Sequence, residues 1–193
     1  MKRKYWVLLI FCFGILLLDQ WTKHAVQQSV LLNHSVEVVQ GFFNLVHVRN
    51  PGGAFGIFGW EKGGFRSLLF VGFSLIAIGS ILFLFIRLRE DEKVFSLSLS
   101  LVLSGAIGNL IDRLKYGEVV DFLDFHLFSY HWPAFNIADS AITLGIGLMV
   151  FELLIRDRKK SEFQNPYHAS RAQHAPHLPK PQIGIHQIPQ HKG

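Results

Sequence analysis

The sequence has one cysteine in 193 residues, so it cannot form an internal disulfide, and cysteine usage excludes no redox compartment. Charged residues are absent from two long stretches, 67–86 and 94–111, which have 20 and 18 residues. Each stretch is long enough to cross about 30 Å of hydrocarbon as a helix. Half of all residues are hydrophobic and the mean hydropathy is +0.29, which is typical of a membrane protein. We therefore expect a membrane all-α fold.

Two further spans are less clearly marked. The uncharged N-terminal run, 5–18, reaches membrane length only if its helix continues through Asp19 to about Val26. The last apolar segment has the required length but contains Asp139 near its start and Glu152 near its end. We thus predict four transmembrane helices, over about 5–26, 65–86, 94–114 and 135–155.

The N-terminal span has two competing interpretations. Its basic start is compatible with a cleavable signal peptide, but the segment that follows, DQWTKHAV, lacks the small-residue pattern of a cleavage site. Lipid attachment at Cys12 is disfavoured because the bulky Phe11 stands where a small residue is wanted, so Cys12 is better explained as apolar filling. We interpret the segment as a retained transmembrane helix.

Basic residues flank the spans on alternate sides. They precede the first span, separate the second from the third, and follow the fourth: Lys2, Arg3, Lys4; Arg87, Arg89, Lys93; Arg156, Arg158, Lys159, Lys160. Because cytoplasmic loops carry the excess of Lys and Arg, we expect both termini in the cytoplasm. The net charge of +5 follows from this pattern. It does not indicate a nucleic-acid partner, since no basic stretch alternates with stacking aromatics.

The two remaining loops, 27–64 and 115–134, are expected on the extracytoplasmic side. Residues 36–50 alternate partially and are rich in Val and Phe, which predicts two short strands broken at Gly41. A tight turn should follow at Gly52 and Gly53, where the backbone can approach another group closely. The expected fold is therefore four transmembrane helices with a small β-sheet and loop on the outer face.

Two segments carry patterns that need separate interpretation. The SLSLSL run in the third span alternates with period two, but its length and lack of charge favour a helix with serines at a helix contact. Residues 159–193 are polar and rich in proline and histidine, so a disordered cytoplasmic tail is expected after a membrane domain of residues 1–158. Its five histidines are irregularly spaced without a cysteine partner, which disfavours a specific metal site.

Five aspartates lie in or beside the apolar segments: Asp19, Asp112, Asp121, Asp124 and Asp139. An ionised carboxylate at bilayer depth costs from about 3 to more than 10 kcal/mol, so such acids are usually paired, solvated or functional. The predicted topology places all five at the outer membrane face, with Asp121 and Asp124 in the loop after the third span. Asp112 has Arg113 beside it, which favours a structural role.

Asp121 and Asp139 have no adjacent cation in the sequence. Two carboxylates that are close together in a poorly solvated site cannot both ionise easily, so such a pair shares a proton. Aspartic proteases use this arrangement: the ionised member takes a proton from water while the neutral member protonates the substrate carbonyl.

The residues around these acids resemble the bacterial lipoprotein signal peptidases, also called signal peptidase II. Five blocks match in the family's order and on its four-span frame: DQWTK (19–23), NPGGAFGIF (50–58), GAIGNLIDRL (105–114), VVDFLDF (119–125) and FNIADSAI (135–142). The resemblance covers residues 5–155. Variation at the Gly52–Gly53 pair and the long histidine-containing tail are departures that leave the two aspartates in place.

The resemblance implies that Asp121 and Asp139 are the catalytic aspartates and that Asp124 is only a neighbour. It also implies a set of polar residues that brace the dyad or hold the substrate backbone: Asp19, Asn50, Asn109, Asp112, Arg113 and Asn136. Helix packing or capping is the alternative role for each. For Asn136, an N-cap of the last span is equally well supported by the sequence.

The resemblance further implies an intramembrane aspartic endopeptidase of the bacterial cytoplasmic (inner) membrane. Such an enzyme removes signal peptides from diacylglyceryl-modified prolipoproteins by cleaving before the lipidated cysteine. The implied partners are these substrates and membrane lipids, with a monomeric enzyme. The strands in 36–50 and the glycine turn are hypothesised to clasp the substrate. No metal or cofactor is expected, since five histidines lie scattered without ligand spacing: His24, His34, His47, His126 and His131.

Two other functions are compatible with acids in a membrane protein. A proton-coupled transporter or channel subunit would place its acids near the bilayer middle and break a pair of helices, which this sequence does not indicate. A membrane scaffold without enzymatic activity would tolerate Asp-to-Asn changes. A different intramembrane aspartyl protease is disfavoured because the sequence contains no Gly-x-Gly-Asp.

Overall fold

The computed structural model describes residues 2–52, 64–128 and 130–164. The chain divides into two units, residues 1–153 and 154–193. All of the sheet and the first three helices belong to the first unit. The described part of the second unit is the C-terminal end of the last helix.

Four helices in the described part of the chain are long and apolar enough to cross a membrane. They are α1 (Arg3–Ser29), α2 (Gly64–Arg87), α3 (Lys93–Tyr116) and α4 (Ile137–Gln164). Together with a small antiparallel sheet, they confirm the expected fold class. The predicted tail begins at Lys159, whereas α4 continues to Gln164; residues 165–193 lie outside the described residues.

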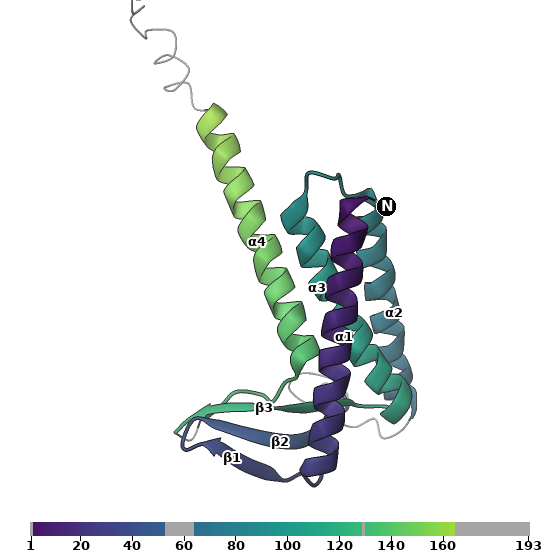
Figure 1. The fold of residues 1–193 in the computed structure, drawn as a ribbon, viewed down its shortest axis with the longest axis vertical. Helices are drawn as coiled ribbons and strands as arrows, with labels where there is room; N and C mark the ends of the chain where they lie inside the picture. Colours follow the sequence, from purple (N-terminus) through teal and green to yellow (C-terminus); the bar gives the residue numbers. More distant parts are fainter. Residues whose placement is uncertain (1, 53–63, 129, 165–193) are drawn as a thin grey trace, which may run out of the picture. The chain divides into compact units, whose positions relative to one another are not determined.

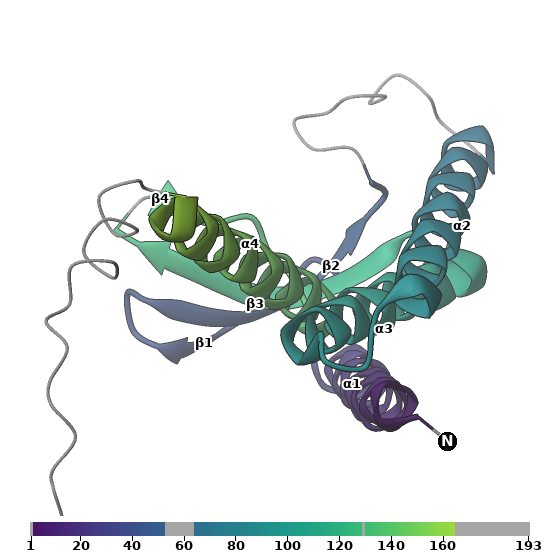
Figure 2. The ribbon, with the colours of Figure 1, turned by 90° about the horizontal axis from the view of Figure 1, so that it is seen from above.

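Helix α3 is the central helix of the first unit and packs against both α1 and α2 (Figures 1 and 2). Much of it is buried, while α1 and α2 expose most of their apolar side chains. The serine-rich run is helical as expected: Ser98, Ser100 and Ser104 are fully buried, and each hydroxyl donates to the carbonyl four residues earlier. These bonds satisfy the hydroxyls inside the helix, so the serines can line an apolar contact.

Glycines bring α3 and α4 into close contact. A Cβ atom on Gly145 of α4 would lie 2.7 Å from the Ser98 carbonyl oxygen and from Val102 Cγ2 of α3. A Cβ atom on Gly105 of α3 would overlap the carbonyl of Ala138 in the first turn of α4. The absence of side chains at these two positions therefore sets how closely α4 approaches the centre of the bundle.

A four-stranded antiparallel sheet lies at the end of the helices where α1 and α3 end and α4 begins (Figure 1). Its strands are β1 (Ser35–Val39), β2 (Phe43–Asn50), β3 (Val119–Leu127) and β4 (Tyr130–His131), in that order. The first two strands confirm the prediction, and Gly41 has a φ of +69° in the turn between them. The predicted loop around Asp121 and Asp124 is wrong, because both residues lie on β3.

Sheet pairing explains why this segment is a strand. Residues 119–125 of β3 pair with β2, and Leu123 also exchanges hydrogen bonds with Phe135 just before α4. Phe122 packs with Val26 and Val30 at the end of α1. Tertiary contacts therefore select a strand for a segment whose two acids obscure any alternation of polar and apolar residues.

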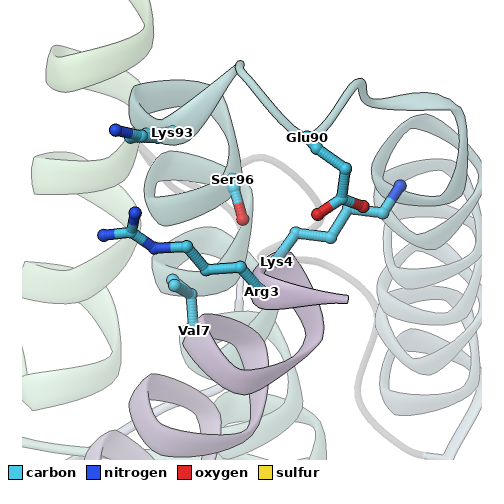
Figure 3. Close-up of a pocket in the computed structure, with 6 residues that line it drawn as sticks. All are labelled: Arg3, Lys4, Val7, Glu90, Lys93 and Ser96. Atoms are coloured by element: carbon cyan, nitrogen blue, oxygen red, sulfur yellow. The ribbon is translucent and has the colours of Figure 1, made fainter. Parts of the chain in front are cut away.

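A buried lysine stabilises the opposite end of the bundle. Lys4 donates to three carbonyl oxygens at the C-terminus of α2, those of Phe85, Ile86 and Leu88, at 3.3, 3.0 and 2.6 Å. Carbonyl groups at the end of a helix lack the amide partner that the next turn would supply, and a cation near them is favoured by the helix dipole. Figure 3 shows the surrounding pocket, in which Arg3 and Lys93 lie on one side and Glu90 on the other.

Candidate active site

Asp121 and Asp139 approach one another from two different elements. Asp121 is the third residue of β3 and pairs in register with Val48 of β2, and it is only 2% exposed. Asp139 lies in the first turn of α4, where the helix dipole favours negative charge. The short connection through β4 brings the end of the strand back to the start of the helix.

Asn136 is the residue that links the two carboxyl groups. Its side-chain amide donates to Asp121 Oδ1 at 2.7 Å and lies within 3.3 Å of the Val120 carbonyl and Asn109 Oδ1. Its Oδ1 accepts from the Asp139 backbone N–H at 2.9 Å, while Asp139 Oδ2 accepts from the Asn136 N–H at 3.3 Å. This reciprocal pair is a capping box, so the N-cap role and the contact with Asp121 occur together.

Two further asparagines, Asn50 and Asn109, donate hydrogen bonds to the two carboxylates. Asn50, the last residue of β2, donates to Asp121 Oδ2 at 3.0 Å, and its Oδ1 accepts from the Gly52 N–H at 2.9 Å. Asn109 of α3 donates to Asp139 Oδ1 at 2.7 Å. Three asparagines on three elements thus fix the orientation of both acids. Gly53, the second glycine of the predicted turn, lies outside the described residues.

The electrostatic environment of Asp121 favours its neutral form. Burial, followed by the negative charge of Asp139, raises the pKa of Asp121 to about 7. Hydrogen bonds from Asn50 and Asn136 and the charge of Lys23 act in the opposite direction and are weaker. Near neutral pH the pair can therefore hold a proton that one isolated aspartate would have lost.

A buried ion-pair cluster lies directly beside the dyad. Lys23 Nζ contacts Asp19 Oδ2 at 2.9 Å and Asp112 Oδ2 at 2.8 Å, and all three side chains are almost completely buried. Lys23 also donates to Asn109 Oδ1 at 3.2 Å, which connects the cluster to Asp139 through one amide. The expectation that Arg113 compensates Asp112 is wrong, because the contacting cation is Lys23.

The cluster joins four elements of the fold. Asp19 Oδ1 accepts from the Ala138 N–H in the first turn of α4 at 2.9 Å, and Asp112 Oδ2 accepts from the Val120 N–H of β3 at 3.1 Å. Gln20 donates to both acids, at 3.2 and 3.0 Å. Lys23 and Gln20 were not among the predicted site residues. The spacing of Asp19 and Lys23, which places both on one face of a helix, was the available signal.

Arg113 points away from this cluster toward α2. Its guanidinium group lies 5.8 Å from the centre of the Phe70 ring, and its Nη1 is 3.5 Å from Ser74 Oγ. Asp139, Asp112 and Asp121 all act on it electrostatically. Arg113 therefore contributes positive charge to this end of the bundle without touching a predicted catalytic aspartate in the described structure.

Asp124 belongs to a separate group on the hairpin of β3 and β4. Burial raises the pKa of Asp124, but hydrogen bonds from Asn44 and His131 outweigh this effect and hold the pKa below its ordinary value. His126 lies on the same strand, and its ring stacks on that of His131. The expectation that all histidines lie scattered is wrong for this pair. Among the described residues, Asp124, His126 and His131 could hold a metal ion.

The geometry supports one kind of chemistry at the dyad. Asp121 is buried and Asp139 is half-buried. Two carboxyl groups that share one proton in such a site could deprotonate a water molecule and protonate a carbonyl oxygen in the same step. The site lies at the end of helices that have membrane length. Fold and site together define the class as a membrane aspartic peptidase.

Comparison with known proteins identifies the family. The model of the signal peptidase (SPase) II family matches residues 11–155. Lipoprotein signal peptidases of Syntrophus aciditrophicus (strain SB) and Desulforapulum autotrophicum are 45% and 47% identical to this chain over 161 and 140 residues. These alignments cover 83% and 72% of this chain and 100% and 86% of the relatives. The chain belongs to the signal peptidase II family.

Solved structures of membrane enzymes share this fold. A bacterial membrane enzyme determined by the in meso method at 1.9 Å resolution matches with a TM-score of 0.69 and 33% sequence identity. The match covers 76% of this chain and 92% of that chain. A second such structure, at 2.3 Å, gives a TM-score of 0.69 at 32% identity and covers 82% of this chain and 91% of that chain.

Proposed function

We propose that this enzyme removes signal peptides from diacylglyceryl-modified prolipoproteins by cleaving the peptide bond before the lipidated cysteine. Relatives with 45% and 47% identity are lipoprotein signal peptidases. The observation that carries the proposal is the pair Asp121 and Asp139, whose carboxyl groups are both bonded to asparagine amides and joined through Asn136.

The proposed reaction uses the shared proton of the dyad. The ionised carboxylate takes a proton from a water molecule as that water attacks the scissile carbonyl carbon. The neutral carboxyl group gives its proton to the carbonyl oxygen, which forms a neutral tetrahedral intermediate. The protonated carboxyl group then gives its proton to the amide nitrogen while the other carboxylate takes a hydroxyl proton from the intermediate. The C–N bond breaks, which releases the amino group of the lipidated cysteine and the carboxyl end of the signal peptide. The dyad ends the cycle with one proton, as it began.

The surrounding residues maintain this protonation state. Asn50 and Asn136 fix the two oxygens of Asp121, and Asn109 fixes Asp139. Lys23 contacts both Asp19 and Asp112, so it offsets part of the negative charge that these two acids add beside the dyad. Asp19 and Asp112 act as positioning residues, because they bind backbone N–H groups of α4 and β3 next to the catalytic aspartates.

The proposed location follows from the fold and the basic loops. We place the enzyme in the bacterial inner membrane as a monomer, with residues 1–158 as the peptidase domain and with both termini in the cytoplasm. The dyad then lies near the outer face, at the end where α1 and α3 finish. A substrate anchored by acyl chains and an apolar helix reaches this level laterally. Strands β1 and β2 and the turn at Gly52 clasp its extended segment.

The deciding experiment measures cleavage of a diacylglyceryl-modified prolipoprotein by purified enzyme. Asp121→Asn and Asp139→Asn should each lower kcat by at least about 1,000-fold, because an amide can neither accept the water proton nor share one. Asp91→Asn is the matched control, since Asp91 is an exposed loop residue paired with Arg89. Circular dichroism checks that each variant retains its helices.

Full activity of either folded dyad variant would remove that residue from the mechanism. Cleavage of a prolipoprotein that lacks the diacylglyceryl group at the same rate would instead overturn the proposed substrate class. An inactive wild-type enzyme that carries all four helices would overturn the function as a whole.

A further inference from the structure

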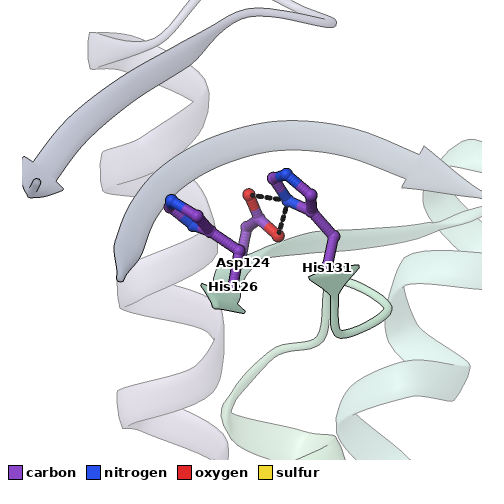
Figure 4. A group of neighbouring side chains, drawn as sticks. All are labelled: Asp124, His126 and His131. Carbon is purple, nitrogen blue, oxygen red and sulfur yellow. Dashed lines mark hydrogen bonds and ion pairs between the residues drawn. The ribbon is translucent and has the colours of Figure 1, made fainter. Parts of the chain in front are cut away.

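A cluster of three metal-binding side chains lies on the β3–β4 hairpin, apart from the catalytic dyad. Asp124 and His126 are two residues apart on β3, and His131 is the cross-strand partner of His126. Side chains two apart on a strand share a face, so all three project to the same side (Figure 4). Asp121 is three residues from Asp124, which places the dyad on the opposite face of the strand.

We propose that Asp124, His126 and His131 form a binding site for Zn²⁺. Each residue offers one ligand atom, and these three atoms all lie within 4.8 Å of one another. One carboxylate oxygen and two imidazole nitrogens are a common donor set for zinc, with a water molecule in the fourth position.

The ligand atoms have to come closer together to hold a metal ion. In a tetrahedral site, atoms that bind Zn²⁺ at about 2.0–2.2 Å lie about 3.3–3.6 Å apart, so no separation in the cluster has to shrink by more than about 1.5 Å. The His131 side chain is 52% exposed and therefore has room to rotate. Asp124 already contacts His131 Nδ1 at 3.1 and 3.2 Å through its two carboxylate oxygens. The imidazole rings of His126 and His131 stack with their centres 4.7 Å apart.

A neighbouring amide fixes the orientation of the ligands. Asn44 of β2 donates to Asp124 Oδ2 at 2.9 Å and lies 3.4 Å from His126 Nδ1. Asp124 is mostly buried while His131 is exposed, so the site opens to solvent on one side. Outer hydrogen-bond partners of this kind orient metal ligands and raise their affinity.

The bound metal would hold β4 against β3. Strand β4 has only two residues, and its described ladder consists of the pairs His126–His131 and Leu127–Tyr130. A pair of strands this short is weak in water, and a metal bridging both strands would add the link that the ladder lacks. The inference does not depend on the proposed function, because it concerns binding alone.

The test uses the full chain and Zn²⁺ as the only probe. Five histidines in the tail can bind zinc themselves, so the starting protein carries glutamine at each of them: His168, His174, His177, His186 and His191. Isothermal titration calorimetry then measures zinc binding, and Co²⁺ substitution with visible absorption reports the coordination number. Hydrogen exchange with and without zinc follows the backbone amides of β4.

We expect one Zn²⁺ per chain and slower amide exchange in β4. His126→Ala and His131→Ala should each weaken binding by more than about 100-fold, and Asn44→Ala by about 10- to 100-fold. His34→Ala is the matched control, because His34 is exposed in another loop and should leave affinity unchanged. Helical content and thermal unfolding without metal verify that each variant is folded.

A specific zinc site predicts that affinity falls most in the two histidine variants, less in Asn44→Ala and not at all in the control. Absence of saturable zinc binding in the protein without tail histidines would overturn the proposal. So would binding that His126→Ala and His131→Ala leave within twofold of the starting protein. Binding that disappears equally in the His34→Ala control would show that zinc acts elsewhere, and this outcome would also overturn it.

Discussion

Three asparagine side chains, those of Asn50, Asn109 and Asn136, donate amide hydrogens to the carboxyl groups of Asp121 and Asp139, the proposed catalytic pair. An amide is suited to this position because it carries no charge and does not titrate, so its hydrogen bonds persist whichever aspartate holds the proton. A lysine or arginine in the same place would ionise both carboxylates and remove the shared proton.

The pH dependence of cleavage should reflect the loss of the proton that Asp121 and Asp139 share. The pKa of Asp121 is raised to about 7, so the proton of the pair is lost as the pH rises through that range. We expect kcat/KM of the wild-type enzyme to fall on the alkaline side with an apparent pKa near 7. A pH–rate profile with a substrate dissolved in detergent measures this fall. A kcat/KM that stays constant from pH 6 to about 9 would contradict the prediction.

Asn50→Ala should move this alkaline limb to higher pH. The hydrogen bond from Asn50 stabilises the ionised carboxylate of Asp121 and so lowers its pKa; without that bond the proton is held more tightly. A hydrogen bond to a charged group is worth about 1.5–3 kcal/mol, which corresponds to a shift of roughly one to two pH units. Gln28→Ala, an exposed amide on α1, is the control. An unshifted limb would show that Asn50 does not act on the titrating pair.

The sequence predicts Asp121 and Asp139 as a dyad but does not predict all of the partners that the structure gives them. Acids without an adjacent cation beside apolar spans point to a site, and the resemblance to the family singles out these two as catalytic. Lys23 was missed because it lies on an apolar helix and pairs with Asp112 from a distant part of the chain. His126 and His131 come together only through β4, which no alternation of residues predicted.

At the level of elements, the position of Asp139 depends on how closely α4 packs on α3. Gly145 is buried at this contact, and a Cβ atom there would meet the Ser98 carbonyl, Val102 and Leu101 at 2.7–3.1 Å. Gly147, two residues along the same helix, has open space around it. The two glycines therefore provide a matched pair that separates packing from helix propensity.

Gly145→Ala should destabilise the protein by about 1–3 kcal/mol, the usual cost of overpacking, and should also lower kcat because α4 carries Asp139. Gly147→Ala should unfold at or slightly above the wild-type temperature, since alanine favours a helix by up to about 1 kcal/mol over glycine. Thermal unfolding in detergent and prolipoprotein cleavage measure the two effects. Equal unfolding temperatures and equal cleavage rates in the two variants would argue against tight packing at Gly145.

Elements determined by a local sequence pattern were predictable, whereas an element determined by tertiary contacts was not. Helices α2 and α3 were predictable because long charge-free runs have few alternatives in a membrane protein. Strands β1 and β2 showed enough alternation to be recognised. Strand β3 was not, because it depends on pairing with β2 and on packing of Phe122 against the end of α1.

At the scale of the whole molecule, the Lys23 cluster joins elements that are far apart in sequence. Lys23 of α1 binds the Asp112 carboxylate of α3, and the carboxylates of Asp19 and Asp112 bind the backbone of α4 and β3. All three charged side chains are almost completely buried, so water does not weaken their attraction. The energetic consequence is that no member of the cluster can be removed alone without a large cost.

Lys23→Met should lower the free energy of unfolding by about 3–5 kcal/mol, because two buried carboxylates lose their cation. Combining it with Asp19→Asn and Asp112→Asn should recover part of this loss, since no uncompensated charge then remains. Lys115→Met, which removes an exposed lysine that contacts Gln20, is the control. Thermal unfolding in detergent compares the four proteins; a triple variant less stable than Lys23→Met would contradict the electrostatic explanation.

The double role of Asn136 restricts which sequences can encode this enzyme. Serine, threonine and aspartate also cap helices, so each could begin α4 in place of asparagine. None of them offers both a neutral N–H donor for Asp121 and an oxygen for the Asp139 N–H. A saturation library at this position should therefore yield several residues when selected for folding and asparagine alone when selected for cleavage. Mutational drift at position 136 would thus abolish activity before it abolished the fold.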